Sequence, residues 1–361
     1  MGISSFYRGM SPLCFLPNGN LVCYKSGKLY VFSNKQLVKK CNVFKTYKEK
    51  YISKSKLLSR VLRLGVRSAI SLNDNKIIVS IGNMLYECDL LKKSLSVGFS
   101  LTERIRPLIF TQVKDINGFD DMIIFGGYLR NPDKKPVHIY KRIDKDNWDV
   151  VYTFNQGEIN HIHNIIPDIF RNCLWVLTGD FDSSSAIWKI TDGFKKIERV
   201  FCNDQKYRSC VAFALKEGLL YATDTPFDDN FIYLMDDDFN IKPIYSISGS
   251  CIYGCQWNDN FIFSSTVEAD GRNQTLLQFL FSKKRGYGIK DRYVHLYMGN
   301  LKNGFNEIYK EKKDWFPFLF QFGVFKFPIG FNSSTELYFQ PIATTTNDSD
   351  LMIINTISNG S

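Results

Sequence analysis

Residues 67–83 read RSAISLNDNKIIVSIGN, and this stretch decides the fold. Arg67 stands first and a short apolar segment follows it. The segment 72–75, LNDN, then supplies the Asn and Asp residues that favour a tight turn. The apolar run 77–81 is a second expected strand, and Gly82 with the Asn after it turns the chain back. The stretch therefore predicts paired antiparallel strands introduced by a charged residue.

The same order of a polar or charged cluster, an apolar strand, a turn and another strand recurs seven times along the chain. Most of these polar clusters lie about 40 to 50 residues apart, which is the period of propeller blades with four strands each. We therefore predict an all-β protein, a single β-propeller domain over residues 1–361 with seven blades of four antiparallel strands. The expected blades cover about 11–44, 65–100, 103–154, 160–201, 206–247, 249–311 and 314–357.

Composition and charge agree with this class. The chain has 30 Phe and 19 Tyr, and aromatic residues favour strands. Much of the net charge of +10 is concentrated between Lys35 and Arg67, where Glu49 is the only acidic residue. Leucines at near-helical spacing predict a basic, partly helical insertion at about 45–64, and a second inserted loop is expected at about 283–292. No aromatic-interleaved binding motif accompanies the basic insertion, so nucleic acid is not the expected partner.

The cysteines and the apolar runs bear on location. Nine cysteines are spaced irregularly and form no CxxC pair, which argues against a disulfide framework and against a cysteine zinc site. No leader pattern stands at the N-terminus, and no apolar run reaches the roughly 18 residues that span a bilayer. We expect reduced thiols, no transmembrane segment and a cytoplasmic location.

Three arginines are the candidate substrate-binding residues. The first strand of every propeller blade lines the central axis, so the polar clusters at the blade heads are expected to converge there. Arg67, Arg106 and Arg208 each stand near such a head, and a guanidinium grips a carboxylate with two parallel hydrogen bonds. The alternative is that each arginine pairs with an acid of a neighbouring blade, such as Asp180 or Asp224.

The candidate catalytic residues are His161, His163, Tyr207, Asp180 and Asp224. The two histidines are two positions apart and would share one face of a strand, with Cα atoms about 6 to 7 Å apart. They could act as a general base or donate to a substrate carboxylate, and a divalent metal at this pair is the alternative to the expected absence of a cofactor. Tyr207 precedes Arg208, so only one of these two side chains can face the axis of a regular strand, and packing between blades is the alternative for Tyr207.

Two segments carry a resemblance to a known group. Residues 140–148, YKRIDKDNW, resemble the Asp-box of bacterial neuraminidase repeats, and residues 189–197, KITDGFKKI, resemble a second one. The run from His161 to Pro226 is similar to uncharacterised glycosidase-like, sialidase-like propellers. The resemblance implies a propeller that acts on carbohydrate. It also implies that Asp144 and Asp192 close outer turns and are not catalytic.

These observations lead to two functional hypotheses. In the first, the protein acts on an acidic glycan, containing uronate or sialate, in the central funnel. Glycoside hydrolysis needs a carboxyl pair or a Tyr nucleophile with an acid, whereas β-elimination needs a cation for the carboxylate and a base. In the second, a non-catalytic propeller binds a glycan or a protein partner. The sequence leaves open whether the protein is an enzyme.

Overall fold

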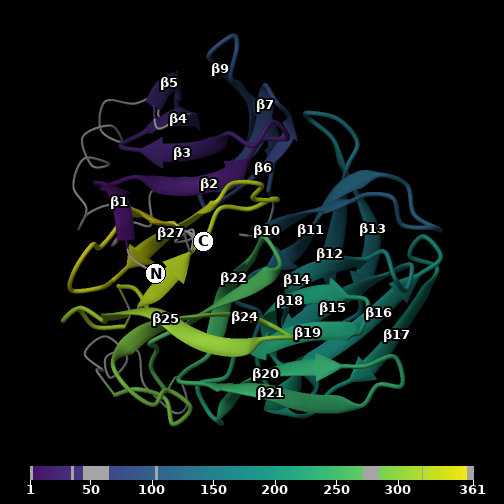
Figure 1. Ribbon diagram of the computed structural model, residues 1–361. Coiled ribbons are helices and arrows are strands. Elements are labelled where there is room, and N and C mark those ends of the chain that lie inside the picture. Colours follow the sequence, from purple (N-terminus) through teal and green to yellow (C-terminus); the bar gives the residue numbers. More distant parts are fainter. Residues whose placement is uncertain are drawn as a thin grey trace.

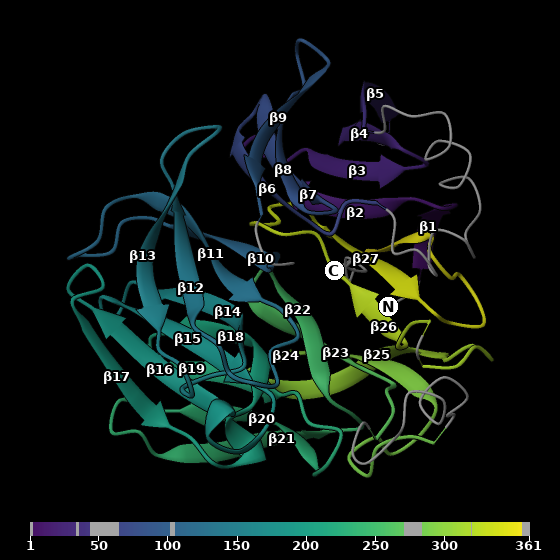
Figure 2. The ribbon, with the colours of Figure 1, turned by 180° about the vertical axis from the view of Figure 1, so that it is seen from behind.

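The computed structural model describes residues 3–33, 36–43, 65–101, 105–270, 284–318 and 320–355. It is an all-β protein in which seven four-stranded antiparallel sheets surround an axis as the blades of a propeller (Figures 1 and 2). Two 3₁₀ turns, η1 (Asp182–Ser184) and η2 (Gln205–Tyr207), are the only helical segments within these described ranges. The predicted fold class is confirmed, whereas the insertion predicted at about 45–64 lies outside the described residues.

The strands run outward from the axis in chain order in six of the blades. Blade 1 has β2 (Ser11–Phe15), β3 (Leu21–Lys25), β4 (Lys28–Ser33) and β5 (Gln36–Asn42). Blade 2 has β6 (Ser68–Asn73), β7 (Lys76–Ile81), β8 (Met84–Asp89) and β9 (Ser94–Ser100). Blade 3 has β10 (Arg106–Val113), β11 (Met122–Tyr128), β12 (Val137–Arg142) and β13 (Trp148–Phe154).

The next three blades repeat this order. Blade 4 has β14 (His161–Asp168), β15 (Cys173–Gly179), β16 (Ala186–Thr191) and β17 (Lys196–Phe201). Blade 5 has β18 (Ser209–Leu215), β19 (Gly218–Thr223), β20 (Asn230–Met235) and β21 (Ile241–Ile247). Blade 6 has β22 (Cys251–Trp257), β23 (Asn260–Ser265), β24 (Tyr293–Asn300) and β25 (Gly304–Lys312).

Blade 7 differs because its strands come from both ends of the described chain. It has β26 (Val324–Lys326), β27 (Glu336–Ile342) and β28 (Leu351–Asn355), and β1 (Ile3–Tyr7) completes it as the outermost strand. Strand β1 pairs antiparallel with β28, for example Phe6 with Met352. The segment predicted for the seventh blade, about 314–357, therefore supplies three of its four strands, and the N-terminal strand, whose part in this blade the sequence leaves open, supplies the fourth.

The blades are held together by apolar side chains packed between neighbouring sheets. Between blades 3 and 4 the contact includes Ile124, Ile162 and Trp188, all buried. Trp175 and Trp257 are each 1% exposed and belong to such clusters, as expected for core aromatics. Because neighbouring innermost strands contact each other from blade 1 through to blade 7, this packing fixes the positions of the blade heads.

The two segments that resemble Asp-boxes both form turns between the third and fourth strands of a blade. The carboxylate of Asp144 accepts hydrogen bonds from the backbone N–H of Asp146 (2.8 Å) and of Asn147 (2.9 Å). In the next blade, Lys195 N–H donates to the Asp192 carbonyl (3.1 Å). Both aspartates thus lie at the outer hairpins, remote from the innermost strands.

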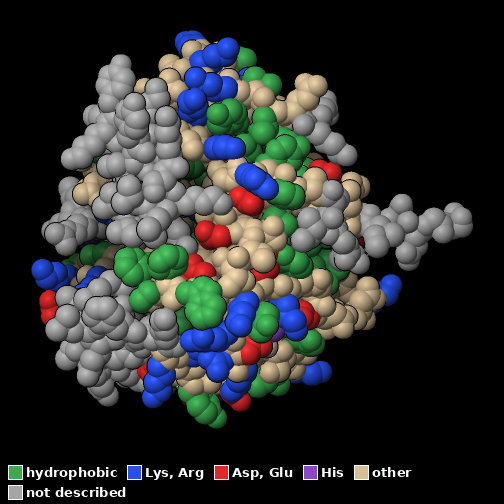
Figure 3. All heavy atoms as spheres, turned by 90° about the vertical axis from the view of Figure 1, so that its left-hand side faces the viewer, with side chains coloured by type: hydrophobic (Ala, Val, Ile, Leu, Met, Phe, Trp, Pro, Cys, Tyr) green, Lys and Arg blue, Asp and Glu red, His purple; other side chains and the backbone are tan. Residues whose placement is uncertain are grey.

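The surface carries its charge in separate groups. On the side of the ring shown in Figure 3, Lys and Arg side chains gather in patches with exposed hydrophobic side chains between them. The described residues also expose large aromatics such as Trp315 (77%) and Phe331 (69%). Within the described ranges no helix is long and apolar enough to cross a membrane.

Candidate functional site

The candidate site lies at the rim where the innermost strands begin, here called the N-terminal rim. In each blade the second strand runs back to this rim, so a residue at or next to its end pairs with the first residue of the innermost strand. His161 is in register with Gly179, and Ser209 with Thr223. Asp180 and Asp224 follow these second strands directly. The register therefore places an acid beside the head of the innermost strand in both blades.

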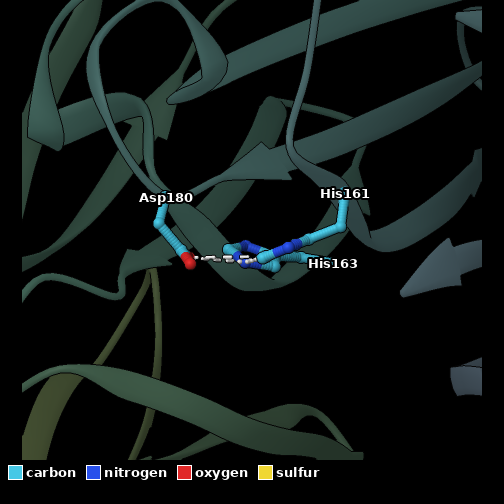
Figure 4. A group of neighbouring side chains, drawn as sticks. All are labelled: His161, His163 and Asp180. Carbon is cyan, nitrogen blue, oxygen red and sulfur yellow. Dashed lines mark hydrogen bonds and ion pairs between the residues drawn. The ribbon is translucent and has the colours of Figure 1, made fainter. Parts of the chain in front are cut away.

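His161, His163 and Asp180 form a tight cluster, here called the His–Asp cluster (Figure 4). The Nε2 atoms of the two histidines are 3.0 Å apart. Asp180 Oδ1 lies 3.2 Å from His163 Nε2 and 3.4 Å from His161 Nε2. Both imidazoles are buried, whereas the Asp180 side chain is 29% exposed. The cluster is thus covered by protein on the histidine side and reaches solvent through the carboxylate.

Backbone carbonyls define the orientation of both imidazole rings. His161 Nδ1 lies 3.0 Å from the Leu129 carbonyl oxygen, and His163 Nδ1 lies 2.9 Å from the Ser209 carbonyl oxygen. A carbonyl only accepts, so each Nδ1 carries a hydrogen and donates it. Both Nε2 atoms then face the Asp180 carboxylate.

Arg208 connects the His–Asp cluster with blade 5. Its Nη2 lies 3.2 Å from Asp180 Oδ1, and its Nε lies 3.5 Å from Asp224 Oδ2. Burial opposes ionisation of Asp180, but Arg208 and His161 hold the pKa of this carboxyl well below its ordinary value. Burial raises the pKa of Asp224 even though Arg208 acts in the opposite sense. The guanidinium therefore has two acid partners, which is the alternative considered from sequence for this arginine.

Two further groups complete the acidic side of the rim. Cys210 Sγ donates to Asp224 Oδ2 (3.2 Å). Burial, and to a smaller extent the nearby Asp224, raise the pKa of this thiol well above its ordinary value. Glu268 follows the second strand of blade 6 and accepts a short hydrogen bond from Ser250 Oγ. Burial and the neighbouring Asp224 raise the pKa of Glu268 to about 8. This rim therefore carries a carboxyl that stays protonated at neutral pH.

Tyr128 connects the His–Asp cluster with a basic group on the other side. Its ring centroid is 4.5 Å from that of His161, and the Arg67 guanidinium lies 5.5 Å from the Tyr128 ring. Lys326 Nζ donates to the Arg67 carbonyl (3.0 Å). Burial and the adjacent Arg67 lower the pKa of Lys326 to about 8. Burial raises the pKa of Tyr128, so its hydroxyl stays protonated at neutral pH.

The structure brings five of the predicted site residues into direct contact: His161, His163, Asp180, Arg208 and Asp224. Arg67 joins them through Tyr128. Arg106 instead donates from Nη2 to Asn83 Oδ1 (3.0 Å), in the turn between β7 and β8. Tyr207 stacks on Phe201 of the outermost strand of blade 4, with ring centroids 4.7 Å apart. Tyr207 and Arg106 therefore stand apart from the His–Asp cluster, and Tyr207 packs between blades because Arg208 occupies the inward position.

Sequence reasoning missed Tyr128, Glu268 and Lys326. Tyr128 is the last residue of β11, and Glu268 stands three residues after β23, so both lie near a second-strand end but not directly after it, as Asp180 and Asp224 do. Aligning the blades on these strand ends would have pointed to Leu129 and Thr266 instead. Lys326 ends a strand of only three residues in the irregular seventh blade, and no repeat position marks it.

A loop inserted in blade 6 lies next to this acidic side. Gly288 N–H donates to the Pro226 carbonyl (2.9 Å), and Gly286 N–H donates to the Glu268 carbonyl (3.2 Å). The loop, residues 284–292, surrounds an open pocket of about 630 Å³. The charged and aromatic side chains that line this basic pocket are Lys284, Arg285, Tyr287, Lys290 and Arg292. Cationic side chains thus gather beside the rim, in the second insertion expected from the sequence.

Comparisons with known proteins identify the fold. No family model matches the sequence, and no curated protein matches it significantly. A chain of a structure described as the mitotic checkpoint complex aligns with TM-score 0.58 and 7% identity, over 98% of this chain and 94% of that one. The AfRom2 CNH domain aligns with TM-score 0.54 and 7% identity, over 98% and 97%. An oligogalacturonate lyase from Vibrio parahaemolyticus aligns with TM-score 0.51 and 12% identity, over 84% and 78%.

At these identities the likeness shows the fold alone. The comparisons therefore support a seven-bladed propeller, and they contain no sign of the sialidase-like repeats that the sequence segments resemble. What this chain does has to be argued from its own residues.

Proposed function

We propose that the protein acts on a uronate-containing acidic glycan at the N-terminal rim and cleaves it by β-elimination. The observation that carries the proposal is the position of Lys326, whose Nζ donates to the Arg67 carbonyl and which lies, through Tyr128, next to the His–Asp cluster. Burial and Arg67 lower the pKa of this lysine to about 8. A base with a pKa near the working pH is efficient in proton transfer, and β-elimination needs such a base next to a group that neutralises the uronate carboxylate.

The roles follow from the charges. Arg67 pairs with the substrate carboxylate and makes the adjacent carbon-bound hydrogen more acidic. Neutral Lys326 removes that proton, the electron pair forms a carbon–carbon double bond, and the bond to the leaving glycosidic oxygen breaks. Tyr128, which stays protonated, donates a proton to the leaving oxygen. The proton taken by Lys326 and the one lost by Tyr128 are exchanged with water after the products leave.

Two features of the surroundings support a glycan as the ligand. The basic pocket beside the rim suits the carboxylates of an extended acidic chain, and its Tyr287 is 69% exposed, with Lys290 Nζ 4.8 Å from the ring. Phe181, which follows Asp180, is also exposed and stacks on Phe227 with ring centroids 5.7 Å apart. Exposed aromatic rings offer flat apolar faces for sugar rings. The Vibrio protein of similar fold is an oligogalacturonate lyase, and an activity of that kind is compatible with this proposal.

Hydrolysis is the second candidate, because two carboxyls at the rim differ in protonation. Asp180 is held ionised, while Glu268 keeps its proton up to a pH of about 8. Glycosidases use such a combination of an ionised carboxylate and a protonated acid. The resemblance to sialidase-like propellers belongs to this candidate, and it rests on the outer turns at Asp144 and Asp192 and on the run from His161 to Pro226. A reduced, cytoplasmic setting is likewise part of the proposal, supported by nine free thiols.

The test is incubation with oligogalacturonate, oligoglucuronate and sialyl-oligosaccharides, while ultraviolet absorbance and reducing ends are both measured. Elimination generates an absorbing unsaturated product together with new reducing ends, whereas hydrolysis generates reducing ends alone. Binding by calorimetry without any turnover would instead support the non-catalytic alternative and overturn the proposal.

Variants assign the base. Lys326→Met should abolish the absorbing product, and the wild-type rate should rise with pH and level off above about 8 as Lys326 loses its proton. The control is Lys302→Met, because Lys302 is an exposed lysine in the outer turn of blade 6. Equal turnover of Lys326→Met and the control would exclude Lys326 as the base.

A further inference from the structure

The His–Asp cluster holds more acceptors than donors at one point. Each Nδ1 donates to a backbone carbonyl, so the two facing Nε2 atoms, 3.0 Å apart, would both be lone-pair acceptors in neutral rings. Asp180 Oδ1 adds a negative acceptor at 3.2 and 3.4 Å. Arg208 Nη2, 3.2 Å from Asp180 Oδ1, compensates the charge of that oxygen from outside the cluster. The two Nε2 lone pairs and Oδ1 still converge, and they repel each other unless a positive species lies between them.

His295, a histidine outside the cluster, shows what a complete arrangement is like. His295 lies in β24 and has Glu307 Oε2 2.6 Å from Nδ1 and Asp291 Oδ2 3.0 Å from Nε2. Each ring nitrogen faces its own carboxylate, so a protonated imidazole donates on both sides and satisfies the group. The His–Asp cluster lacks this arrangement, because two Nε2 atoms share one carboxylate oxygen.

We infer that His161 Nε2, His163 Nε2 and Asp180 Oδ1 are the ligands of a divalent transition-metal ion at the N-terminal rim. The three atoms lie within 4.8 Å of one another, which suits one ion between them. Nitrogen ligands of imidazole with one carboxylate oxygen favour zinc and its first-row neighbours over magnesium or calcium.

The surroundings have the features of a metal site. The carbonyls of Leu129 and Ser209 accept the Nδ1 hydrogens and thereby orient both rings, which is the outer contact that metal-bound histidines have in proteins. The Asp180 side is partly open, so water or a substrate carboxylate can occupy the remaining positions. The second group of possible ligands, His163, Cys210 and Asp224, shares His163 and needs a thiol to lose its proton against a raised pKa. We therefore place the ion at the first group.

The catalytic meaning of this ion rests on the function proposed above, since a cation at the rim would help Arg67 to neutralise the uronate carboxylate. Metal binding itself is measured without substrate. Metal-free protein should bind Zn²⁺ and Co²⁺ with a stoichiometry of one in calorimetry, and the Co²⁺ complex should show visible absorption bands of nitrogen and oxygen coordination. Protons should be released on binding if one had occupied the cluster.

Two variants and one control make the test specific. His161→Ala and Asp180→Asn should each weaken Zn²⁺ binding by more than the roughly 10- to 100-fold that loss of an outer contact costs. His295→Gln, which alters the other histidine–carboxylate group, should leave the affinity unchanged. Thermal unfolding of the metal-free variants checks that they fold. The inference is overturned if the wild-type protein binds neither ion, or if the His161→Ala variant binds them as well as the wild type does. In either case a shared proton, and not a metal ion, lies between the three acceptors.

The outcome is separable from that of the proposed function. Metal binding without turnover on any acidic glycan would retain the metal site and reject the lyase. Turnover that persists in a metal-free, chelator-treated protein would retain the lyase and reject a catalytic ion.

Discussion

At the residue scale, the site depends on residues with small side chains as much as on charged residues. Gly179 ends β15 directly before Asp180, and a Cβ atom there would lie 2.2 Å from His163 Cε1. The sequence predicts two histidines on one face of a strand, because residues two apart on a strand share a face. It does not predict that a glycine on the neighbouring strand makes room for the ring, since this depends on the register between β14 and β15.

We predict that Gly179→Ala displaces the His163 ring and abolishes metal binding and turnover. Gly126→Ala is a matched control, because a Cβ atom there would lie 2.3 Å from Ile162 Cγ2. Ile162 is on the same strand as His163, β14, but its side chain lies in the apolar core. Both variants should lose about 1–3 kcal/mol of unfolding free energy through overpacking. Denaturant unfolding and turnover are measured on both. A proportionate loss of turnover in the two variants would contradict a specific effect at His163.

Glu268 leads to a prediction about pH. The folded protein holds the Glu268 proton up to a pH of about 8, whereas an unfolded chain releases it near pH 4.3. The proton therefore favours the folded state at pH 5, and this contribution is lost as pH rises to 8. Relative to Glu268→Gln, the wild-type unfolding free energy should fall across this range, by at most about 1.4 kcal/mol per pH unit. Parallel urea titrations of the two proteins between pH 5 and 8 measure the difference, and superimposable pH profiles would refute a raised pKa.

At the element scale, the limits of the strands and turns could be predicted well. The directions in which side chains at the strand ends point could be predicted less well. The blades from 65 to 247 start and end within a few residues of their predicted limits, because alternating apolar strands and Asn, Asp or Gly turns are local signals. The sequence could not decide in the same way which of Tyr207 and Arg208, just before β18, faces the axis. Tyr207 lies in the short 3₁₀ turn η2 before the strand, and this bend turns its ring toward Phe201 while Arg208 enters the rim.

The inserted loop 284–292 should govern the binding of acidic chains rather than the chemical step. We predict that the double variant Lys284→Gln/Arg292→Gln raises KM for an acidic oligosaccharide by up to about 30-fold at low salt, since each exposed charge contact contributes about 0.2–1 kcal/mol. The value of kcat should stay unchanged, and the effect should shrink as salt screens the charges.

The control for this loop is Lys242→Gln/Lys302→Gln, which removes the same charge from exposed positions on β21 and in the β24–β25 turn. Steady-state kinetics at two ionic strengths distinguishes the two pairs. An identical rise of KM in both double variants would show that only net charge matters.

At the scale of the whole molecule, the ring is closed by pairing between sequence-distant strands. The number of blades could be predicted from the repeat, but the closure could not, because nothing local in Ile3–Tyr7 indicates a partner in Leu351–Asn355. The sequence also predicts that the polar blade heads converge, but Arg106 and Tyr207 lie apart from the His–Asp cluster. Pairing of an arginine with Asp180 or Asp224 is one of two alternatives that the sequence leaves open, and only distances across the axis decide that Arg208 pairs with both acids.

Deleting residues 1–9 should remove about 3–6 kcal/mol of unfolding free energy. The deletion removes the four residue pairs between β1 and β28. It also removes the packing of Tyr7 on Phe32, whose ring centroids are 5.1 Å apart. Residues 3–9 attached after Asn355 through an Asn-Gly turn should restore stability, because β1 then follows β28 as a hairpin. Calorimetric Tm values of the three proteins test this, and a permuted protein as unstable as the truncated one would show that closure does not depend on this pairing.

The origin of β1 also matters while the protein is being synthesised. The ribosome releases this strand before the other described strands, and its partner β28 emerges some 340 residues later. Until then β1 lacks its pairing strand. The growing polypeptide forms an open arc of blades, with exposed sheet faces at both ends. Chaperone engagement of the nascent chain should therefore end only after the last strands have left the exit tunnel.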